Sequence, residues 1–394
     1  MAELYDAIVV GAGPAGSYFA YRLAKLGRRV IVFERKPKVG DSVCCTGIVG
    51  KECFDRFPIA FNAILAEASS ARLFSPSGKL LNLRKETVQA YIVDRAAFDN
   101  ALAQRAQEAG ADYLLSAKVD DIAIVDRCVR ARVEHDGTMI KFDSKVAAIC
   151  NGLGGPLPKA LGLGKIGDSV AGAQAEVSAN GVDEVEVYFG QSIAPGFFAW
   201  LVPSSAGKAL VGLLTRRNPG SYLKKLLTML HAQGKIASDE VEFTYGGIPL
   251  KPLRKTYGER LVVIGDAAGH VKPTTGGGIY YGLLCADMAA DTIHEALCSD
   301  DLSAKRLARY EQRWKEILAR ELQIGYWGRK LYENLSDSQI ERIFDLILSN
   351  NIHEELLQSP DFSFDWHGSF ILRALKHKAL GKTVRSMTKS TPLP

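Results

Sequence analysis

Three glycines near the start of the chain have the spacing that allows a backbone to bind phosphate. Gly11, Gly13 and Gly16 form a Gly-x-Gly-x-x-Gly pattern directly after an apolar run. In such a pattern the first glycine permits a tight turn, the second lets a pyrophosphate approach, and the third lets a helix pack closely against a strand. Free N–H groups at the start of that helix attract the phosphates. The chemistry that this pattern indicates is binding of a dinucleotide.

Two acidic residues and one arginine indicate which dinucleotide is bound. Glu34 follows Gly16 by eighteen residues, where its carboxylate can accept hydrogen bonds from ribose hydroxyls and repel a 2′-phosphate. Asp266 lies far along the chain in the segment 264–269, IGDAAG. An aspartate there can bind the ribityl or ribose hydroxyls of an extended FAD, whereas a simple NAD dehydrogenase has no use for it. Arg95, at the start of an expected helix, can reach the flavin side, although capping of a surface helix explains it equally well.

The elements that must position these residues alternate between strand and helix. An apolar run at 5–10, a helix at about 14–26 stopped by Gly27, and an apolar run at 30–33 predict one β-α-β unit. A further helix is expected at about 96–109. Alternation of this kind predicts a parallel sheet covered by helices.

The rest of the chain divides into two further kinds of structure. Short runs such as 185–189 and 209–214 predict a mainly antiparallel sheet. After residue 301 the chain becomes helical and charged, with apolar residues at helical spacing from Leu307 through Ile317 to Leu322. We therefore predict an α/β fold (α+β overall) with three parts. These parts are a Rossmann-like FAD-binding domain of residues 1–55, 91–155 and 255–300, an inserted antiparallel-sheet substrate domain of residues 56–90 and 156–254, and a helical C-terminal region of residues 301–394.

Composition excludes several other classes of protein. The 394 residues are 47% hydrophobic and carry a net charge of +5, which is too weak to suggest nucleic-acid binding. Seven scattered cysteines indicate neither a disulfide framework nor a metal site. A strand-like run starts at Tyr5, so we expect no signal peptide. The uncharged stretches are broken by glycine and proline, so we expect no transmembrane helix and a cytoplasmic location.

Longer segments carry a specific resemblance. The order of the three FAD motifs resembles the FAD-dependent hydroxylase-type superfamily of flavoproteins. Within it, the chain is similar to the geranylgeranyl reductase family, in particular to its archaeal digeranylgeranylglycerophospholipid reductases. The resemblance covers residues 1 to about 300 and rests on the segments CTGI at 45–48, APGFFAWLVP at 194–203, YGGIP at 245–249 and GDAAGHVKPTTGGGI at 265–279.

The resemblance implies a site for FAD and a channel for a prenyl chain. The cofactor-binding residues that it implies are Gly11, Gly13, Ala15, Gly16, Glu34, Arg35, Cys45, Thr46, Gly47, Arg95, Gly265, Asp266, Gly276, Gly277, Gly278 and Ile279. The substrate-binding residues that it implies are Phe197, Phe198, Trp200, Pro203 and Tyr280. Aromatic residues of this kind also serve ordinary core packing.

The chain departs from the family pattern at two places. Asn151 stands before Gly152 where the family often has an aspartate, so a charged contact to the cofactor side is in doubt. Phe198 and Val202 stand where the reductases commonly carry tyrosine and phenylalanine. We therefore expect a channel of different shape.

Members of the family reduce isolated C=C bonds of polyprenyl chains. Such a bond cannot stabilise a carbanion, so the implied reaction adds a hydride from N5 of the reduced flavin and a proton from the other side, in a dry cavity. The resemblance places Cys45 beside the flavin, where it delivers the proton or orients the alkene. His270 is a second candidate acid. Both side chains can equally be buried structural residues.

Other functions remain open on the same scaffold. One is a flavin-dependent monooxygenase or halogenase, although the halogenase Trp-x-Trp pattern has Phe198 in place of its first tryptophan and no matching lysine is identified. Another is a non-enzymatic prenyl-lipid binding protein, against which the intact Gly265-Asp266 pair argues. The expected partners are a polyprenyl lipid or polyprenyl diphosphate and an external electron donor, NAD(P)H or ferredoxin, with no metal.

A basic segment lies at the end of the sequence. From His367 to Pro394 it contains arginines and lysines, interleaved with apolar residues, and no acidic residue. This pattern is typical of a peripheral contact with anionic headgroups, here at the inner face of the membrane. A solvated helix followed by a frayed end accounts for it equally well.

Overall fold

The predicted β-α-β unit opens the structure. The computed structural model describes the whole chain except residues 1–3, 58, 60, 361, 378–379 and 382–394. In it, β1 (Tyr5–Val10), α1 (Pro14–Lys25) and β2 (Val30–Phe33) follow one another, and β1 pairs in parallel with β2. The glycine-rich turn therefore lies at the carboxyl end of β1, as predicted.

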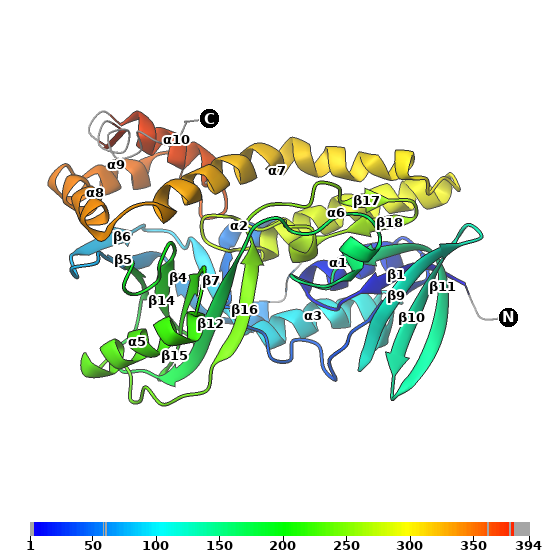
Figure 1. Cartoon of the computed structure of the whole chain (residues 1–394), viewed down its shortest axis with the longest axis horizontal. Coiled ribbons are helices and arrows are strands. Elements are labelled where there is room, and N and C mark those ends of the chain that lie inside the picture. The colour runs from blue at the N-terminus through cyan, green and yellow to red at the C-terminus, as the bar shows by residue number, and fades with distance from the viewer. Residues whose placement is uncertain (1–3, 58, 60, 361, 378–379, 382–394) are drawn as a thin grey trace.

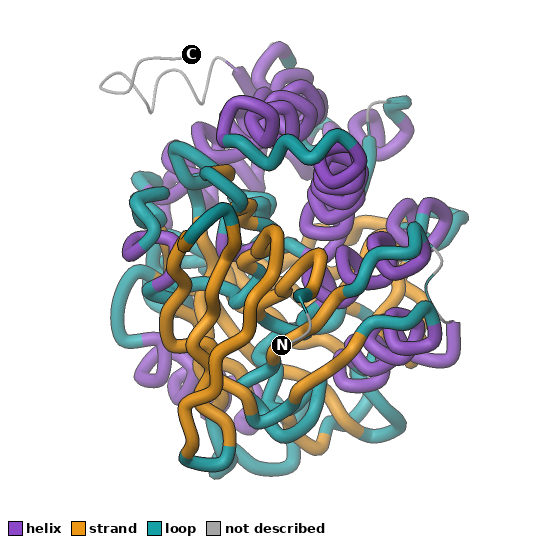
Figure 2. The backbone as a smooth tube through the Cα atoms, turned by 90° about the vertical axis from the view of Figure 1, so that its right-hand side faces the viewer, coloured by secondary structure: helices purple, strands orange, loops and turns teal. Residues whose placement is uncertain are grey.

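The first sheet contains this unit and has the order β17-β18-β11-β1-β2-β8. Its further strands are β8 (Asp112–Leu114), β11 (Thr138–Ile149), β17 (Tyr257–Gly258) and β18 (Leu261–Val263). Two long strands, β9 (Ala117–Val125) and β10 (Cys128–His135), extend it as an antiparallel ribbon paired with β11. Figure 2 looks onto this end of the molecule, with the ribbon strands in front and helices above and beside them.

The central strands are apolar at nearly every position because both of their faces are covered. Ala7 and Val9 of β1 belong to a core cluster with α1, α3 (Arg95–Glu108) and α6 (Ile279–Cys298). Ile8 and Val10 belong to the opposite cluster, which β9 and β10 complete. The sheet is thus the middle layer of three, with helices on one side and a strand ribbon on the other (Figure 1).

The second sheet has the order β16-β12-β15-β14-β13-β5-β6. Its strands are β5 (Ser70–Phe74), β6 (Leu80–Arg84), β12 (Ser169–Ser178), β13 (Val185–Phe189), β14 (Phe198–Pro203), β15 (Lys208–Thr215) and β16 (Thr244–Pro249). All neighbouring strands are antiparallel except β13 and β5, which pair in parallel. The helix α5 (Pro219–Ala232) covers one face through its leucines.

A small third sheet joins the two large ones. It consists of β3 (Ile48–Gly50), β7 (Ala90–Val93) and β4 (Ile64–Ala68), and α2 (Lys51–Arg56) follows β3. The remaining short elements are η1 (Phe61–Ala63), α4 (Leu157–Ala160) and η2 (Gly265–Ala267). Residues 56–90 therefore contribute to both the small sheet and the second sheet. The boundaries of the three predicted domains stay predictions.

The C-terminal region is helical, as predicted. It contains α7 (Ala304–Glu333), α8 (Asp337–Ser349), α9 (Ile352–Gln358) and α10 (Gly368–Lys376). In Figure 1, α7 runs along the upper edge from the first sheet to the second. Leu307, Tyr310 and Trp314 are buried on the predicted face, but Ile317 is 44% exposed because it lies beside that face. None of the described helices is long and apolar enough to cross a membrane.

Candidate active site

The glycine-rich turn has a geometry that only glycine allows at two positions. A Cβ on Gly11, whose φ is +103°, would lie 2.6 Å from the carbonyl oxygen of Cys150. A Cβ on Gly16 would lie 2.0 Å from the carbonyl oxygen of Gly11. By contrast, a Cβ on Gly13 would meet nothing within 4 Å. The turn therefore leaves open space at the position where a pyrophosphate would approach the backbone.

Glu34 lies directly beside this turn. One carboxylate oxygen accepts a hydrogen bond from the N–H of Ala12 at 2.9 Å, and the other accepts from the N–H of Lys36 at 3.0 Å. These bonds fix the carboxylate while leaving further acceptor capacity for ribose hydroxyls. Arg35, the next predicted residue, is exposed.

The Gly265-Asp266 segment lies beside the helix that follows the glycine-rich turn. A Cβ on Gly265 would lie 3.0 Å from the Cβ of Ala15, so the start of α1 and the end of β18 are adjacent. Among the described residues, the carboxylate of Asp266 accepts no hydrogen bond. Burial raises the pKa of Asp266 to about 6, although the guanidinium of Arg95 works in the opposite direction. This carboxylate has free acceptor sites where a polyol such as a ribityl chain would need them.

The residues just before α6 are glycines because neighbouring side chains pack closely against their backbone. A Cβ on Gly278 would lie 2.6 Å from Oδ1 of Asp266, and a Cβ on Gly277 would lie 2.6 Å from Cε of Lys272. Gly276 has a φ of +82°. The helix α6 then begins at Ile279 without a side-chain cap. Its first N–H groups therefore remain available for an anionic or polar group.

Cys45 and Arg95 lie together at this site. The guanidinium of Arg95 forms an ion pair with Asp99 at 2.9 Å, and both side chains are largely buried. Burial alone would lower the pKa of Arg95, but Asp99 and the thiol of Cys45 raise it above its ordinary value. The thiol accepts a hydrogen bond from the N–H of Gly47 at 3.4 Å. Arg95 is therefore a buried residue that contacts Cys45, and not only a surface helix cap.

Gln174 is a residue of this site that sequence reasoning missed. Its Nε2 donates to the carbonyl oxygen of Cys45 at 3.2 Å. Gln174 is buried on β12 of the second sheet. A single glutamine within the apolar run 170–175, VAGAQA, was the only signal that could have indicated it. The contact holds the Cys45–Gly47 segment against the second sheet.

His270 has an environment that keeps its imidazole neutral. The ring is fully buried and lies 4.9 Å from the ring of Trp314 and 6.4 Å from that of Tyr310. Neither ring nitrogen has a hydrogen-bond partner among the described residues. Burial lowers the pKa of His270 to about 3. A neutral imidazole packed against aromatic rings is poorly suited to donate a proton at neutral pH.

Phe197, Phe198 and Trp200 form an aromatic wall. The rings of Phe197 and Phe198 lie 4.8 Å apart, and those of Phe198 and Trp200 lie 6.2 Å apart. They cluster with Leu214 and Ile248, and a Cβ on Gly276 would lie 3.0 to 3.3 Å from these two side chains. The aromatic wall therefore extends to the glycines of the candidate cofactor loop.

The other two predicted substrate residues lie elsewhere. The hydroxyl of Tyr280 donates to Glu52, and its ring contacts Phe57 and Trp366 edge-on in the first core. Pro203, at the end of β14, borders a separate cavity of about 420 Å³ that also contains Arg72. Neither residue belongs to the aromatic wall.

A segment of the C-terminal region closes the same site. Lys272 forms an ion pair with Asp365 at 2.8 Å, and the hydroxyl of Tyr281 donates to the carbonyl oxygen of Asp365. A Cβ on Gly50 would lie 1.8 Å from Oδ2 of Asp365, so any side chain at residue 50 would displace this carboxylate. Sequence reasoning found no motif in this region. In the described part of the chain, no three potential metal ligands from His, Cys, Asp and Glu gather.

Comparisons with known proteins match this geometry over nearly the whole chain. The family model described as "Lycopene cyclase protein" matches residues 6–358. Digeranylgeranylglycerophospholipid reductase 2 from Methanothermobacter thermautotrophicus is 31% identical over 351 residues, covering 86% of this chain and 90% of the relative. A geranylgeranyl bacteriochlorophyll reductase-like protein from Thermoplasma acidophilum has a similar structure, with a TM-score of 0.86 at 24% identity, covering 99% of this chain and 100% of the other. A flavin-dependent brominase is more distant, with a TM-score of 0.67 at 16% identity over 94% of this chain and 98% of the other.

Proposed function

The chain belongs to the lycopene cyclase protein family and to the family of the digeranylgeranylglycerophospholipid reductases. We propose that it uses FAD to saturate isolated C=C bonds of geranylgeranyl chains carried by a lipid. The observation that carries the proposal is the contact between the aromatic wall and the cofactor loop. Leu214 and Ile248, which cluster with the aromatic wall, lie next to Gly276. A long apolar chain that follows the wall would therefore reach the place where a flavin is expected.

The residues of the candidate site fit FAD. The open space at Gly13 would accept the pyrophosphate, and Glu34 would hold the adenosine ribose. Asp266 would bind polyol hydroxyls with its free carboxylate oxygens, and the N-terminus of α6 would face the polar edge of the flavin. When reduced and bound, the flavin supplies the hydride for the alkene.

The side chains around the alkene would exclude water and hold a proton. Phe198 and Trp200 are partly exposed and, backed by the buried ring of Phe197, offer an apolar surface that would keep the alkene in a medium of low polarity. Cys45 is the candidate that orients the alkene or delivers the proton. Its thiol lies beside the guanidinium of Arg95, and Gln174 holds its backbone in place. His270 is a poorer candidate because its ring is enclosed by Trp314 and Tyr310.

The proposal also includes an external electron donor, a polyprenyl substrate and a peripheral membrane contact. The donor is external, either NAD(P)H or ferredoxin, and the substrate is a polyprenyl lipid or a polyprenyl diphosphate. A peripheral membrane contact would need an exposed apolar face on the basic segment. Phe370 and Leu375 of α10 instead pack in a cluster with Ile352 and Leu356. The rest of the basic segment, residues 378–379 and 382–394, lies outside the described residues.

The proposal is tested by an anaerobic reoxidation experiment. The purified protein is loaded with FAD, reduced chemically and mixed with a geranylgeranyl lipid, and both flavin absorbance and product mass are followed. We expect reoxidation with a gain of two hydrogens for each bond saturated. Reoxidation only after oxygen is admitted, with an oxygenated or halogenated product, would instead indicate a monooxygenase or halogenase. A protein that binds prenyl lipid but no flavin would indicate the non-enzymatic alternative.

A further inference from the structure

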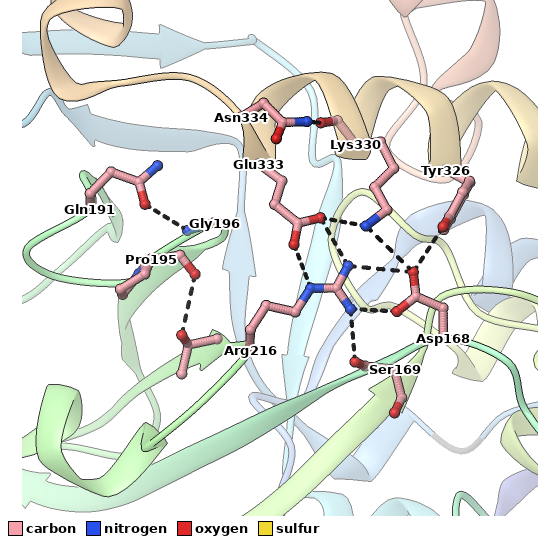
Figure 3. Close-up of polar contacts among 11 residues, drawn as sticks. Asp168, Ser169, Gln191, Pro195, Gly196, Arg216, Tyr326, Lys330, Glu333 and Asn334 are labelled. Carbon is pink, nitrogen blue, oxygen red and sulfur yellow. Dashed lines mark hydrogen bonds and ion pairs between the residues drawn. The ribbon is translucent and has the colours of Figure 1, made fainter. Parts of the chain in front are cut away.

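A network of charged side chains lies where α7 meets the second sheet. The guanidinium of Arg216 donates hydrogen bonds to Asp168 and to Glu333. The hydrogen bond from Nη2 of Arg216 to Glu333 is 2.8 Å long. Tyr326 donates to Asp168 at 2.8 Å, and Nζ of Lys330 lies 3.0 Å from Glu333. Figure 3 shows these five side chains converging from α7, from the residue before β12 and from the residue after β15. Every member of this network has a partner.

Arg329, which lies in the same region, makes no side-chain hydrogen bond to the described residues. Its side chain on α7 is 3% exposed, and its Nε, Nη1 and Nη2 have no hydrogen-bond partner among the described residues. Its guanidinium lies over the ring of Phe197, with Cζ 4.2 Å from the ring centroid. A cation–π contact recovers part of the lost solvation but satisfies none of the N–H donors.

Charge balance also leaves Arg329 without a counterion. Among the described residues no ion pair includes Arg329, and the two carboxylates that attract its charge, Asp168 and Glu333, are already paired with Arg216 and Lys330. Burial raises the pKa of Asp168, but hydrogen bonds from Arg216 and Tyr326 bring it below its ordinary value, so this carboxylate stays ionised. Burial lowers the pKa of Arg329 to about 10, which still leaves it charged at neutral pH. A buried unpaired cation is unfavourable unless an anion joins it.

The position of Arg329 indicates which anion would join it. The ring of Phe197, which lies under the guanidinium, is the first ring of the aromatic wall. The hydroxyl of Tyr332 on α7 donates a hydrogen bond to the carbonyl oxygen of Phe197 at 2.8 Å. Gln191 accepts a hydrogen bond from Gly196, which holds the preceding loop (Figure 3). An amphiphile that lays its chain along the wall toward Gly276 would thus have its polar end near Arg329.

We propose that Arg329 binds the phosphate ester of the prenyl substrate and sets the position of the chain relative to the flavin. This inference rests on the proposed function. A guanidinium presents its N–H donors in a planar fork that fits phosphate oxygens. Because Arg329 stacks on Phe197 and makes no hydrogen bond to the described residues, it can turn toward a phosphate without breaking one.

A binding experiment tests the site without relying on catalysis. Thermal unfolding of the wild type, Arg329→Met and the control Arg320→Met is measured in chloride buffer, with and without geranylgeranyl phosphate or inorganic phosphate. Arg320 is exposed on the same helix. We expect geranylgeranyl phosphate to raise the Tm of the wild type and of Arg320→Met, and to have a much smaller effect on Arg329→Met. Equal shifts in all three proteins would overturn the proposal, and a shift with inorganic phosphate alone would overturn the assignment to a lipid headgroup.

A kinetic experiment separates this proposal from the proposed function. Reduction of geranylgeranyl phosphate is compared with reduction of the neutral geranylgeraniol. For Arg329→Met we expect at least a tenfold rise in KM for the phosphate and an unchanged KM for the alcohol, with partial recovery in Arg329→Lys. Equal changes for both substrates would indicate a structural role and overturn the proposal. If the wild type reduces neither substrate, the proposed function fails, while the binding experiment still tests Arg329.

Discussion

Nζ of Lys272 and Oδ1 of Asp365 lie 2.8 Å apart, although 93 residues separate them in the chain. Both side chains are almost fully buried, at 5% and 3% exposure. Lys272 belongs to the loop between Asp266 and α6, and Asp365 belongs to the segment between α9 and α10. This ion pair therefore attaches the C-terminal region to the candidate cofactor loop.

Removing one partner of this pair should be costly. Asp365→Ala leaves the ammonium of Lys272 buried without its carboxylate, and we expect a loss of about 3–5 kcal/mol in the free energy of unfolding. Urea unfolding followed by circular dichroism measures this loss. Asp120→Ala is the control, because Asp120 and Lys118 form an exposed pair that should contribute at most about 1 kcal/mol. Similar losses in the two variants would show that the buried pair does not stabilise this region.

Gly13 and Gly167 provide a matched test of the FAD site. A Cβ at either position meets nothing within 4 Å, and neither residue has a positive φ. Alanine at either position should therefore leave the flavin-free protein as stable as the wild type. We expect Gly13→Ala to weaken FAD binding at least tenfold, because its methyl group occupies the space for the pyrophosphate, and Gly167→Ala to leave binding unchanged. Fluorescence titration with FAD measures both, and equal affinities would argue against pyrophosphate at Gly13.

Asp266→Asn should stabilise the flavin-free protein in a pH-dependent way. The folded-state pKa of about 6 lies above the ordinary value of 3.8, so ionisation of Asp266 opposes folding. This penalty is absent below pH about 4, grows as the pH rises to about 6, and is constant above. The gain in stability from the asparagine should therefore be larger near pH 7.5 than near pH 4.5, by about 2 kcal/mol.

Thermal unfolding of wild type and Asp266→Asn at the two pH values checks this sign. The same substitution should weaken FAD binding, because an amide offers only one acceptor oxygen to the hydroxyls. A pH-independent difference in stability would mean that Asp266 ionises as easily in the folded protein as in the unfolded chain.

Cys45→Ala should separate cofactor binding from alkene reduction. The thiol accepts one backbone hydrogen bond, from Gly47, so its loss should leave FAD bound. If Cys45 delivers the proton, we expect kcat for prenyl reduction to fall by about 10²-fold. Cys128→Ala, on β10 of the strand ribbon, is the control and should keep the wild-type rate. An unchanged kcat in Cys45→Ala would assign the proton to another group.

The dinucleotide part of the site could be predicted from the sequence because its determinants are local. The turn at Gly11, the helix that follows Gly13 and the strand that ends before Glu34 lie within thirty-four residues. Each is dictated by backbone sterics or by apolar runs buried on both faces. The same local logic predicted the buried face of α7, apart from Ile317, which lies at the edge of that face.

Contacts between distant segments could not be predicted, because no local pattern encodes them. Gln174 reaches the backbone of Cys45 only when the second sheet packs against the first, and Asp365 reaches Lys272 only after α7 to α9 carry the chain back. Arg329 reads as an ordinary charged residue of an amphipathic helix. Only the tertiary structure buries its guanidinium on Phe197 without a counterion. The sequence thus determined which cofactor chemistry the chain can support, while packing between distant segments decided which groups close the site and where a charge is left unpaired.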